Sequence, residues 1–201
     1  MPGAGKGARA VIASIAEYLQ YFDAVNRRDI RDIAALPPEA DGWRPANGEG
    51  GTAYTINQLV GHIAGQRLYF LAAYMGEGWT EARINALPGT PVRPQRAPVD
   101  VSARDKWVPA LQQSAAIFAA RLRETPEAWL RRKIPSIDSE RSFSGWRLLM
   151  MMLEHDIAHR SQIDTYAGMN DWNPPPIYNR SAEQIGDLAA QRASGGATGS
   201  P

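Results

Sequence analysis

The sequence predicts an all-α protein whose four long helices form a four-helix bundle. Apolar residues recur at three- and four-residue spacing in four long segments, capping residues precede several of them, and Gly/Pro-rich stretches separate them. A hydrophobic content of 44% and a charged content of 21% in 201 residues are typical of one globular domain with a core. We therefore expect the bundle to span residues 9–178. A disordered N-terminus at 1–8 should precede it, and a short C-terminal helix at 179–193 and a disordered tail at 194–201 should follow.

The first helical segment lies near the N-terminus. Its polar positions include Glu17 and Asp23, which alternate with apolar residues at helical spacing. Pro37 and Pro38 should end any continuation of this helix, because proline lacks a backbone donor and clashes with the preceding turn. Residues 37–54 are predicted to form a loop. The apolar stripe of the helix consists of Val11, Ile15, Tyr18, Leu19, Phe22 and Val25.

The second helix has a clear start signal. Thr55 and Gln58 match the capping-box pattern, in which the two side chains satisfy free amides of the first helical turn. The helix should begin directly after Thr55 and end near Gly76. The long Gly/Pro-rich connection at residues 76–101 is consistent either with a lid or with a simple crossover.

Two further long helices are expected in the second half of the chain. The third should begin after Ser102 and run to about Arg123, with Pro109 marking either a kink or the true start. The fourth should be capped by Ser144 and stopped by Gly168. Residues 133–137 have some extended character, but no strand is assigned. Residues 181–184 repeat the capping pattern and start the short C-terminal helix.

All three histidines of the chain fall within predicted helices. His62 lies in the second helix, and His155 and His159 lie four residues apart in the fourth, so their imidazoles project from one face. A third imidazole from a facing helix would complete a tripod with open coordination positions, as in catalytic metal sites. An H-x-x-x-H pair also arises by chance, and a lone histidine is more often an ordinary core or surface residue. The spacing therefore supports a metal centre without excluding the simpler interpretation.

The amino-acid composition limits the chemistry that the chain can perform and the partners that it can bind. The chain has no cysteine, which excludes disulfides, thiolate zinc sites and a cysteine nucleophile and requires any thiol to come from outside. With 22 basic and 21 acidic residues, nothing indicates a nucleic-acid partner. There is no apolar run of about 18 residues and no signal-peptide core, so we expect a cytoplasmic protein without membrane contact.

Four further residues are candidates for binding or orienting a substrate. At about 100° per residue, Gln58, Gln66 and Tyr69 share the face of the second helix that carries its histidine. Gln162 lies near the face of the fourth helix that carries the histidine pair. Each could equally make a hydrogen bond between helices.

Two stretches of sequence resemble the DinB-like (DinB/YfiT-like) metalloproteins. They are I-N-Q-L-V-G-H-I-A at residues 56–64 and E-H-D-I-A-H-R-S-Q-I at residues 154–163, and the resemblance covers most of residues 9–178. It implies a down-up-up-down four-helix bundle with long crossover connections, a homodimer, and a divalent metal ion, commonly zinc or nickel, held by His62, His155 and His159. Gln162 also matches a glutamine that is common in the family.

The resemblance implies a range of functions. Its members include mycothiol-dependent maleylpyruvate isomerase and thiol S-transferases that use mycothiol, bacillithiol or glutathione. We therefore expect a metal-dependent enzyme that activates a low-molecular-weight thiol cosubstrate, or water, for attack on an electrophilic small molecule. Asp156 and Arg160 are predicted to point to the side of the histidine face, so no general acid or base is compelled there. A metal-dependent hydrolase, or a non-catalytic metal-stabilised stress-response or small-molecule-binding bundle, stays open.

Overall fold

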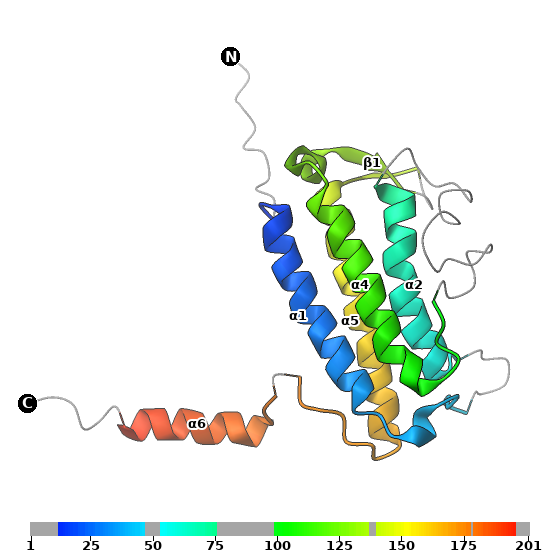
Figure 1. Cartoon of the computed structure of the whole chain (residues 1–201). Helices are drawn as coiled ribbons and strands as arrows, with labels where there is room; N and C mark the ends of the chain where they lie inside the picture. Colours follow the sequence, from blue (N-terminus) through cyan, green and yellow to red (C-terminus); the bar gives the residue numbers. More distant parts are fainter. Residues whose placement is uncertain (1–11, 47–52, 76–98, 137–139, 178, 196–201) are drawn as a thin grey trace, which may run out of the picture.

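Four long helices form the bundle, as the sequence predicts (Figure 1). The computed structural model describes residues 12–46, 53–75, 99–136, 140–177 and 179–195. Helix α1 runs down the bundle, α2 and α4 run up, and α5 runs down again (Figure 1). Helices α2 and α4 are parallel (Figure 1), an order that matches the bundle with a long crossover between its second and third helices. The four helices are α1 (Ile15–Ala34), α2 (Ile56–Tyr74), α4 (Trp107–Arg123) and α5 (Gly145–Met169).

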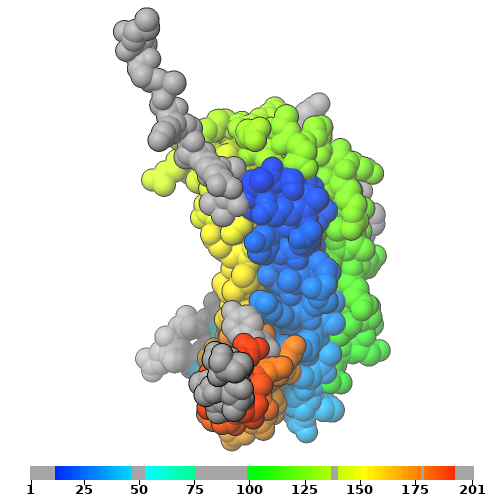
Figure 2. Space-filling model, turned by 90° about the vertical axis from the view of Figure 1, so that its left-hand side faces the viewer, coloured from blue at the N-terminus to red at the C-terminus, as the bar shows by residue number. Residues whose placement is uncertain are grey.

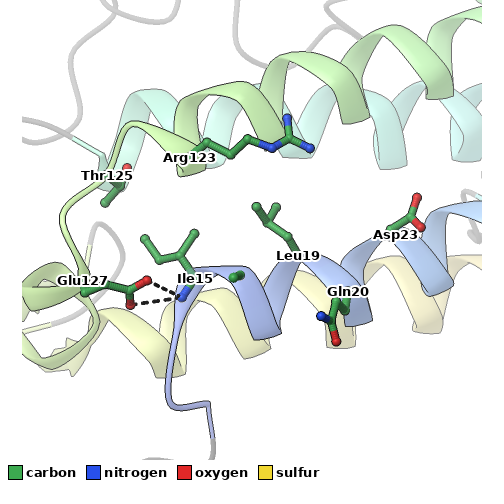
Figure 3. Close-up of a pocket in the computed structure, with 8 residues that line it drawn as sticks. Ile15, Leu19, Gln20, Asp23, Arg123, Thr125 and Glu127 are labelled. Carbon is green, nitrogen blue, oxygen red and sulfur yellow. Dashed lines mark hydrogen bonds between the residues drawn. The ribbon is translucent and has the colours of Figure 1, made fainter.

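Two side chains fix the start of α1. Ser14 is the N-cap, and its hydroxyl accepts a hydrogen bond from the Glu17 backbone N–H at 3.0 Å. Both carboxylate oxygens of Glu127 accept from the Ile15 backbone N–H at 3.1 Å (Figure 3). A carboxylate at this position is favourable because the N-terminus of a helix carries partial positive charge. Within the described part of the predicted loop 37–54, the structure contains one 3-10 turn, η1 (Pro38–Ala40).

The predicted capping box starts α2. The Gln58 N–H donates to the Thr55 hydroxyl at 3.2 Å, and the Thr55 N–H donates to the Gln58 side-chain oxygen at 2.8 Å. The helix buries residues around most of its circumference, from Ile56 to Ala73, so it is the most enclosed element of the bundle. Even so, none of the described helices is both long enough and apolar enough to span a bilayer.

Short elements surround α4. The 3-10 turn η2 (Arg104–Lys106) leads into it, and Pro109 occupies its first turn, where a missing N–H costs no helical hydrogen bond. Pro109 therefore marks the start of the helix and not a kink. After α4, η3 (Glu127–Arg131) leads to an antiparallel pair, β1 (Lys133–Pro135) and β2 (Ser142–Ser144). Strands of three residues are too short to show an alternation of apolar and polar side chains. The sequence therefore indicated extended backbone at residues 133–137 but not the pairing of β1 with β2.

Helix α5 begins where predicted and ends slightly later than predicted. Ser144 is the N-cap residue, but its side chain makes no capping hydrogen bond. The predicted stop at Gly168 is wrong, because the helix continues through it and Asn170 is the C-cap. The chain turns at Asp171, which adopts a left-handed φ of 56° that Asp and Asn tolerate better than most residues.

The C-terminal helix stands apart from the bundle (Figure 1). It is α6 (Ala182–Gly195), and Ser181 and Gln184 form reciprocal capping bonds at its start. It therefore extends two residues into the predicted tail at 194–201. The remainder of that tail, the N-terminal segment 1–8 and most of the connection 76–101 lie outside the described residues.

A polar layer divides the core into two apolar clusters. One cluster, around Phe22 and Phe118, fills the end of the bundle near the β-hairpin. The other, around Trp107 and Ile163, fills the opposite end. Helices α1 and α2 each pack closely against α4 and α5, so they lie diagonally across the bundle from each other. Figure 2 shows the outer face of α1 exposed between α5 and α4. The buried polar residues between the clusters are Asn26, Asp29, Asp32, Arg67, Ser114, Asp156 and Arg160.

Gly145 allows a close approach at the junction of β2 and α5. A Cβ atom there would lie 2.3 Å from the Trp129 carbonyl oxygen and 2.6 Å from its ring carbon Cε3. The Gly145 N–H also donates to the Arg132 carbonyl at 3.1 Å, which fixes the backbone in this position. Any side chain would therefore have to move the η3 backbone.

Replacing Gly145 by alanine should destabilise the protein by about 1–3 kcal/mol, the usual cost of overpacking. Gly168→Ala is the matched control, because it lies in the same helix with no atom within 4 Å of the added methyl group. It should be neutral or stabilising by up to about 1 kcal/mol, because alanine favours the helix. Urea unfolding followed by circular dichroism measures both changes. Equal stabilities for the two variants would contradict the contact at Gly145.

Candidate metal centre

The three histidines converge between α2 and α5. His62 comes from α2, and His155 and His159 come from successive turns of α5. The ring centroids lie 4.8 Å apart for His62 and His155, 4.7 Å for His62 and His159, and 4.5 Å for His155 and His159. One ring nitrogen from each residue can be chosen so that all three lie within 4.8 Å of one another. The predicted grouping of these residues is therefore present.

The spacing of the ring nitrogens fits a common metal ion. The Nε2 atoms of His62 and His155 lie 3.0 Å apart. Two nitrogens bound to one tetrahedral zinc ion, at about 2.0–2.1 Å each, are separated by about 3.3 Å. Small side-chain adjustments would therefore bring the imidazoles to coordination distance. Three imidazoles without thiolate suit zinc, nickel and other borderline divalent ions.

Two neighbouring side chains contact the histidines on α5. The Nδ1 atom of His155 lies 3.4 Å from Oδ1 of Asp156, and Nδ1 of His159 lies 3.2 Å from Oε1 of Gln162. A carboxylate or amide oxygen accepts a hydrogen bond, so we assign the proton of each imidazole to Nδ1. The Nε2 lone pairs are then free to bind a metal, and partners of this kind fix the orientation of metal-binding histidines.

The surroundings favour the neutral form of two of the imidazoles, His62 and His159. Burial, together with the neighbouring His155 and His159, lowers the pKa of His62 from 6.5 to about 4. Burial and His155 also lower the pKa of His159, against the hydrogen bond to Gln162. A metal binds only the unprotonated nitrogen, so it would not have to displace a proton from His62 at neutral pH.

A buried ionic network lies directly behind the histidines. Arg67 is fully buried on α2, and its Nε donates to Asp156 at 2.9 Å. Its Nη2 donates to Asp29 of α1 at 2.8 Å, and its Nη1 donates to Asn26 of α1 at 2.8 Å. Nη1 also lies within hydrogen-bonding distance of α4, at the Leu111 carbonyl and the Ser114 hydroxyl. One guanidinium therefore connects α2 to the other three helices.

A second arginine extends this network. Arg160 of α5 is 4% exposed and lies 3.7–3.8 Å from the carboxylates of Asp29, Asp32 and Asp164. Burial and the nearby Asp156 carboxylate raise the pKa of Asp29 to about 8, against the opposing effect of Arg67 and Arg160. Burial and Asp32 similarly raise the pKa of Asp164 to about 6. Charges therefore concentrate in one layer of the bundle, next to the histidines.

Comparison with known proteins identifies the family. A model of the DinB family matches residues 9–187. The chain belongs to the DinB family. The fold is similar to that of a DinB-like protein from Bacillus cereus ATCC 10987, with a TM-score of 0.62 and 14% identity over 82% of this chain and 97% of that one. No curated protein matches the chain significantly.

The four predicted substrate residues occupy different environments in this DinB-family bundle. Gln162 contacts His159 and also donates to the Tyr166 hydroxyl at 2.8 Å. The side-chain oxygen of Gln58 is engaged in the capping box, 2.8 Å from the Thr55 nitrogen. Gln66 is half-buried on α2, one turn beyond the histidine of that helix. Tyr69 is 7% exposed, and burial raises the pKa of its phenol.

Sequence reasoning missed two neighbours of the site. Tyr54 is 48% exposed, and its ring lies 5.9 Å from that of His62 at an interplanar angle of 21°. It precedes the N-cap of α2, so helical periodicity could not place it. Asp156 was expected to point to the side, whereas it is fully buried and contacts His155. The available signal for this contact was the position of the aspartate in the sequence, directly after one histidine of the pair and three residues before the other.

A groove on another side of the bundle contains none of the histidines. It has a volume of about 560 Å³ and lies between α1 and the C-terminal end of α4 (Figure 3). Apolar Ile15 and Leu19 line it, with Arg123 and Glu127 also contributing polar atoms. The groove and the metal centre are therefore separate features.

Replacing any one of the three histidines by alanine should reduce metal affinity by more than about 100-fold, because losing a direct ligand costs more than losing an outer-sphere partner. The wild-type protein should carry about one divalent ion per chain. Gln66→Ala, one turn from His62, should retain that ion. Elemental analysis after dialysis measures occupancy. Full occupancy in a histidine variant would exclude that residue as a ligand.

The metal-free protein should lose stability through His62 as the pH falls from about 6.5 towards about 4. Over this range His62 becomes protonated in the unfolded chain but stays unprotonated in the folded chain, because its folded-state pKa is about 4. The stability difference between wild type and His62→Gln should therefore change with pH in that window and be constant above it. Urea titrations of both metal-free proteins measure this. A constant difference across the window would contradict the lowered pKa.

Proposed function

We propose that this DinB-family chain is a metal-dependent enzyme that activates a small thiol or water for attack on an electrophilic small molecule. One divalent ion, zinc or nickel, would be held by His62, His155 and His159. The observation that carries the proposal is the convergence of three imidazoles, with Nδ1 of two of them engaged by neighbouring side chains. Three protein ligands leave a tetrahedral ion with one open position, which distinguishes catalytic from structural sites.

The metal and the protein contribute different parts of the chemistry. A bound divalent ion lowers the pKa of a coordinated thiol or water and so favours the anion. Asp156 and Gln162 keep the Nδ1 protons of His155 and His159 in place. The exposed Tyr54 ring, which stacks on His62, offers an apolar surface for a small substrate beside the site.

The side chains around the three histidines support thiol transfer over hydrolysis as the reaction. Hydrolysis usually needs a general acid or base, and among the described residues the nearest carboxylate, Asp156, is already engaged by Arg67. The buried Tyr69 phenol has a raised pKa and stays protonated at neutral pH. A thiolate needs no such group when it displaces a good leaving group. The sulfur–carbon bond forms, the leaving group departs with its electron pair, and the thiol proton passes to solvent.

The proposed partners follow from the same chemistry. The absence of cysteine means that the thiol would be a low-molecular-weight cosubstrate, such as mycothiol, bacillithiol or glutathione. The second substrate would be a small electrophile. We also propose a homodimer that acts in the cytoplasm without nucleic acid or membrane as a partner.

Removing the metal should lower the melting temperature. The ion would bind the folded protein more tightly than the unfolded chain, where the histidines of α2 and α5 are far apart, so occupancy stabilises the folded state by mass action. Differential scanning calorimetry before and after treatment with a chelator measures the shift, and adding metal back should reverse it. A melting curve that is unchanged after complete removal would contradict this coupling.

The thiol-transfer activity should appear as thiol-selective turnover of monochlorobimane. The metal-loaded protein should accelerate the reaction with one of bacillithiol, mycothiol and glutathione more than with the others. His155→Ala should abolish the acceleration, and Gln113→Ala on the exposed face of α4 should retain it. Uncatalysed rates with all three thiols, at full metal occupancy, would contradict thiol transfer and favour the hydrolase or the non-catalytic binding protein.

A further inference from the structure

We infer that Asp156 is a positioning residue for the metal centre: its carboxylate, clamped by Arg67, holds His155 in the orientation that presents Nε2 to the metal. The inference rests on the proposed metal site but not on any reaction performed there. It assigns a role to a buried carboxylate that is not itself placed among the metal ligands.

The two oxygens of the Asp156 carboxylate contact two different partners. Its Oδ2 accepts from Nε of Arg67 at 2.9 Å, and its Oδ1 lies 3.4 Å from Nδ1 of His155. The Asp156 side chain is fully buried, so solvent does not compete for either oxygen. Rotation of the carboxylate away from His155 would also strain or break its bond to Arg67. The imidazole is therefore held by a group that cannot easily move.

Arg67 is itself fixed by the rest of the bundle. Every nitrogen of its guanidinium has at least one partner, and these partners come from α1, α4 and α5. Arg67 also follows His62 by five residues on α2, so one helix supplies both a ligand and the clamp for the ligand on α5. The position of His155 relative to His62 is thereby set through buried contacts as well as through helix packing.

Asp29 provides a closely matched comparison within the same network. Its Oδ2 accepts from Nη2 of Arg67 at 2.8 Å, and its side chain is also fully buried. It lies on α1, and its side chain contacts Arg67 and Arg160 instead of any of the three histidines. A loss of network stability should therefore follow from changing either aspartate, whereas a loss of histidine orientation should follow only from changing Asp156.

The two aspartates should respond differently to the same substitution. Asp156→Asn should weaken metal binding by about 10–100-fold, the usual effect of removing an outer-sphere partner of a ligating histidine. Asp29→Asn should change metal binding by less than about threefold, although it perturbs the same guanidinium. Asp156→Glu, which restores a carboxylate, should recover part of the affinity.

The test is cobalt binding to the full-length, metal-stripped protein. Titration against a chromophoric competitor gives the affinity, and the visible cobalt spectrum reports coordination geometry. Urea unfolding of each metal-free variant measures the stability cost separately. A loss of affinity and an altered spectrum in Asp156→Asn, with Asp29→Asn close to wild type, would support the inference. Equal losses in the two variants would overturn it, since that result indicates a structural role only.

A measurement on the wild-type protein keeps the inference falsifiable if Asp156→Asn does not fold. NMR of the cadmium-loaded protein identifies the nitrogen of His155 that is coupled to the metal. Coordination through Nε2, with a proton on Nδ1, is expected, and coordination through Nδ1 would overturn the inference. Failure of wild type to bind cobalt or cadmium would overturn the metal centre itself, whereas normal metal binding without thiol turnover would affect only the proposed reaction.

Discussion

A single buried guanidinium on α2 makes polar contacts with each of the other three helices of the bundle. Arg67 has no exposed surface, and its hydrogen bonds reach Asn26 and Asp29 on α1, Leu111 and Ser114 on α4, and Asp156 on α5. Helices α1 and α2 lie diagonally across the bundle, so this side chain crosses the core. Buried charges are costly to desolvate, and breaking such a network by removing one partner typically costs about 3–5 kcal/mol. The layer is therefore better understood as fixing the relative positions of the helices than as adding net stability.

The location of the histidines follows from this layer. Apolar clusters fill the two ends of the bundle, and the polar residues lie between them. His62 and His155 lie at the outer edge of the same layer, between α2 and α5, where Asp156 connects the network to an imidazole. The contacts that align the helices thus also align the candidate ligands. Rigid helices supporting a site in this way hold ligands more precisely than loops can.

Patterns within single segments of the sequence were enough to predict most of the fold. They could not predict the contacts between helices. The capping box at Thr55 and Gln58 fixed the start of α2, because both residues belong to one turn. The histidine grouping was predictable because helical spacing brings His155 and His159 to one face and the family resemblance supplied the partner helix. Arg67 and Asp156 could not be assigned roles in the same way. Their environment depends on which helices face each other, and a charged residue in a helix is ordinarily expected on the surface.

The charge of the layer bears on which ligand the metal centre would accept. Three imidazoles contribute no charge, so a divalent ion held by them keeps its full positive charge. Behind it lie the buried arginines Arg67 and Arg160 and the aspartates Asp29, Asp32, Asp156 and Asp164 that surround them. Of these carboxylates, Asp156 contacts a histidine, and its other oxygen is bound by Arg67. An open coordination position on such a centre would favour an anion over a neutral ligand, because three neutral imidazole ligands leave the charge of the ion uncompensated. This preference supports a thiolate as the ligand at the proposed site.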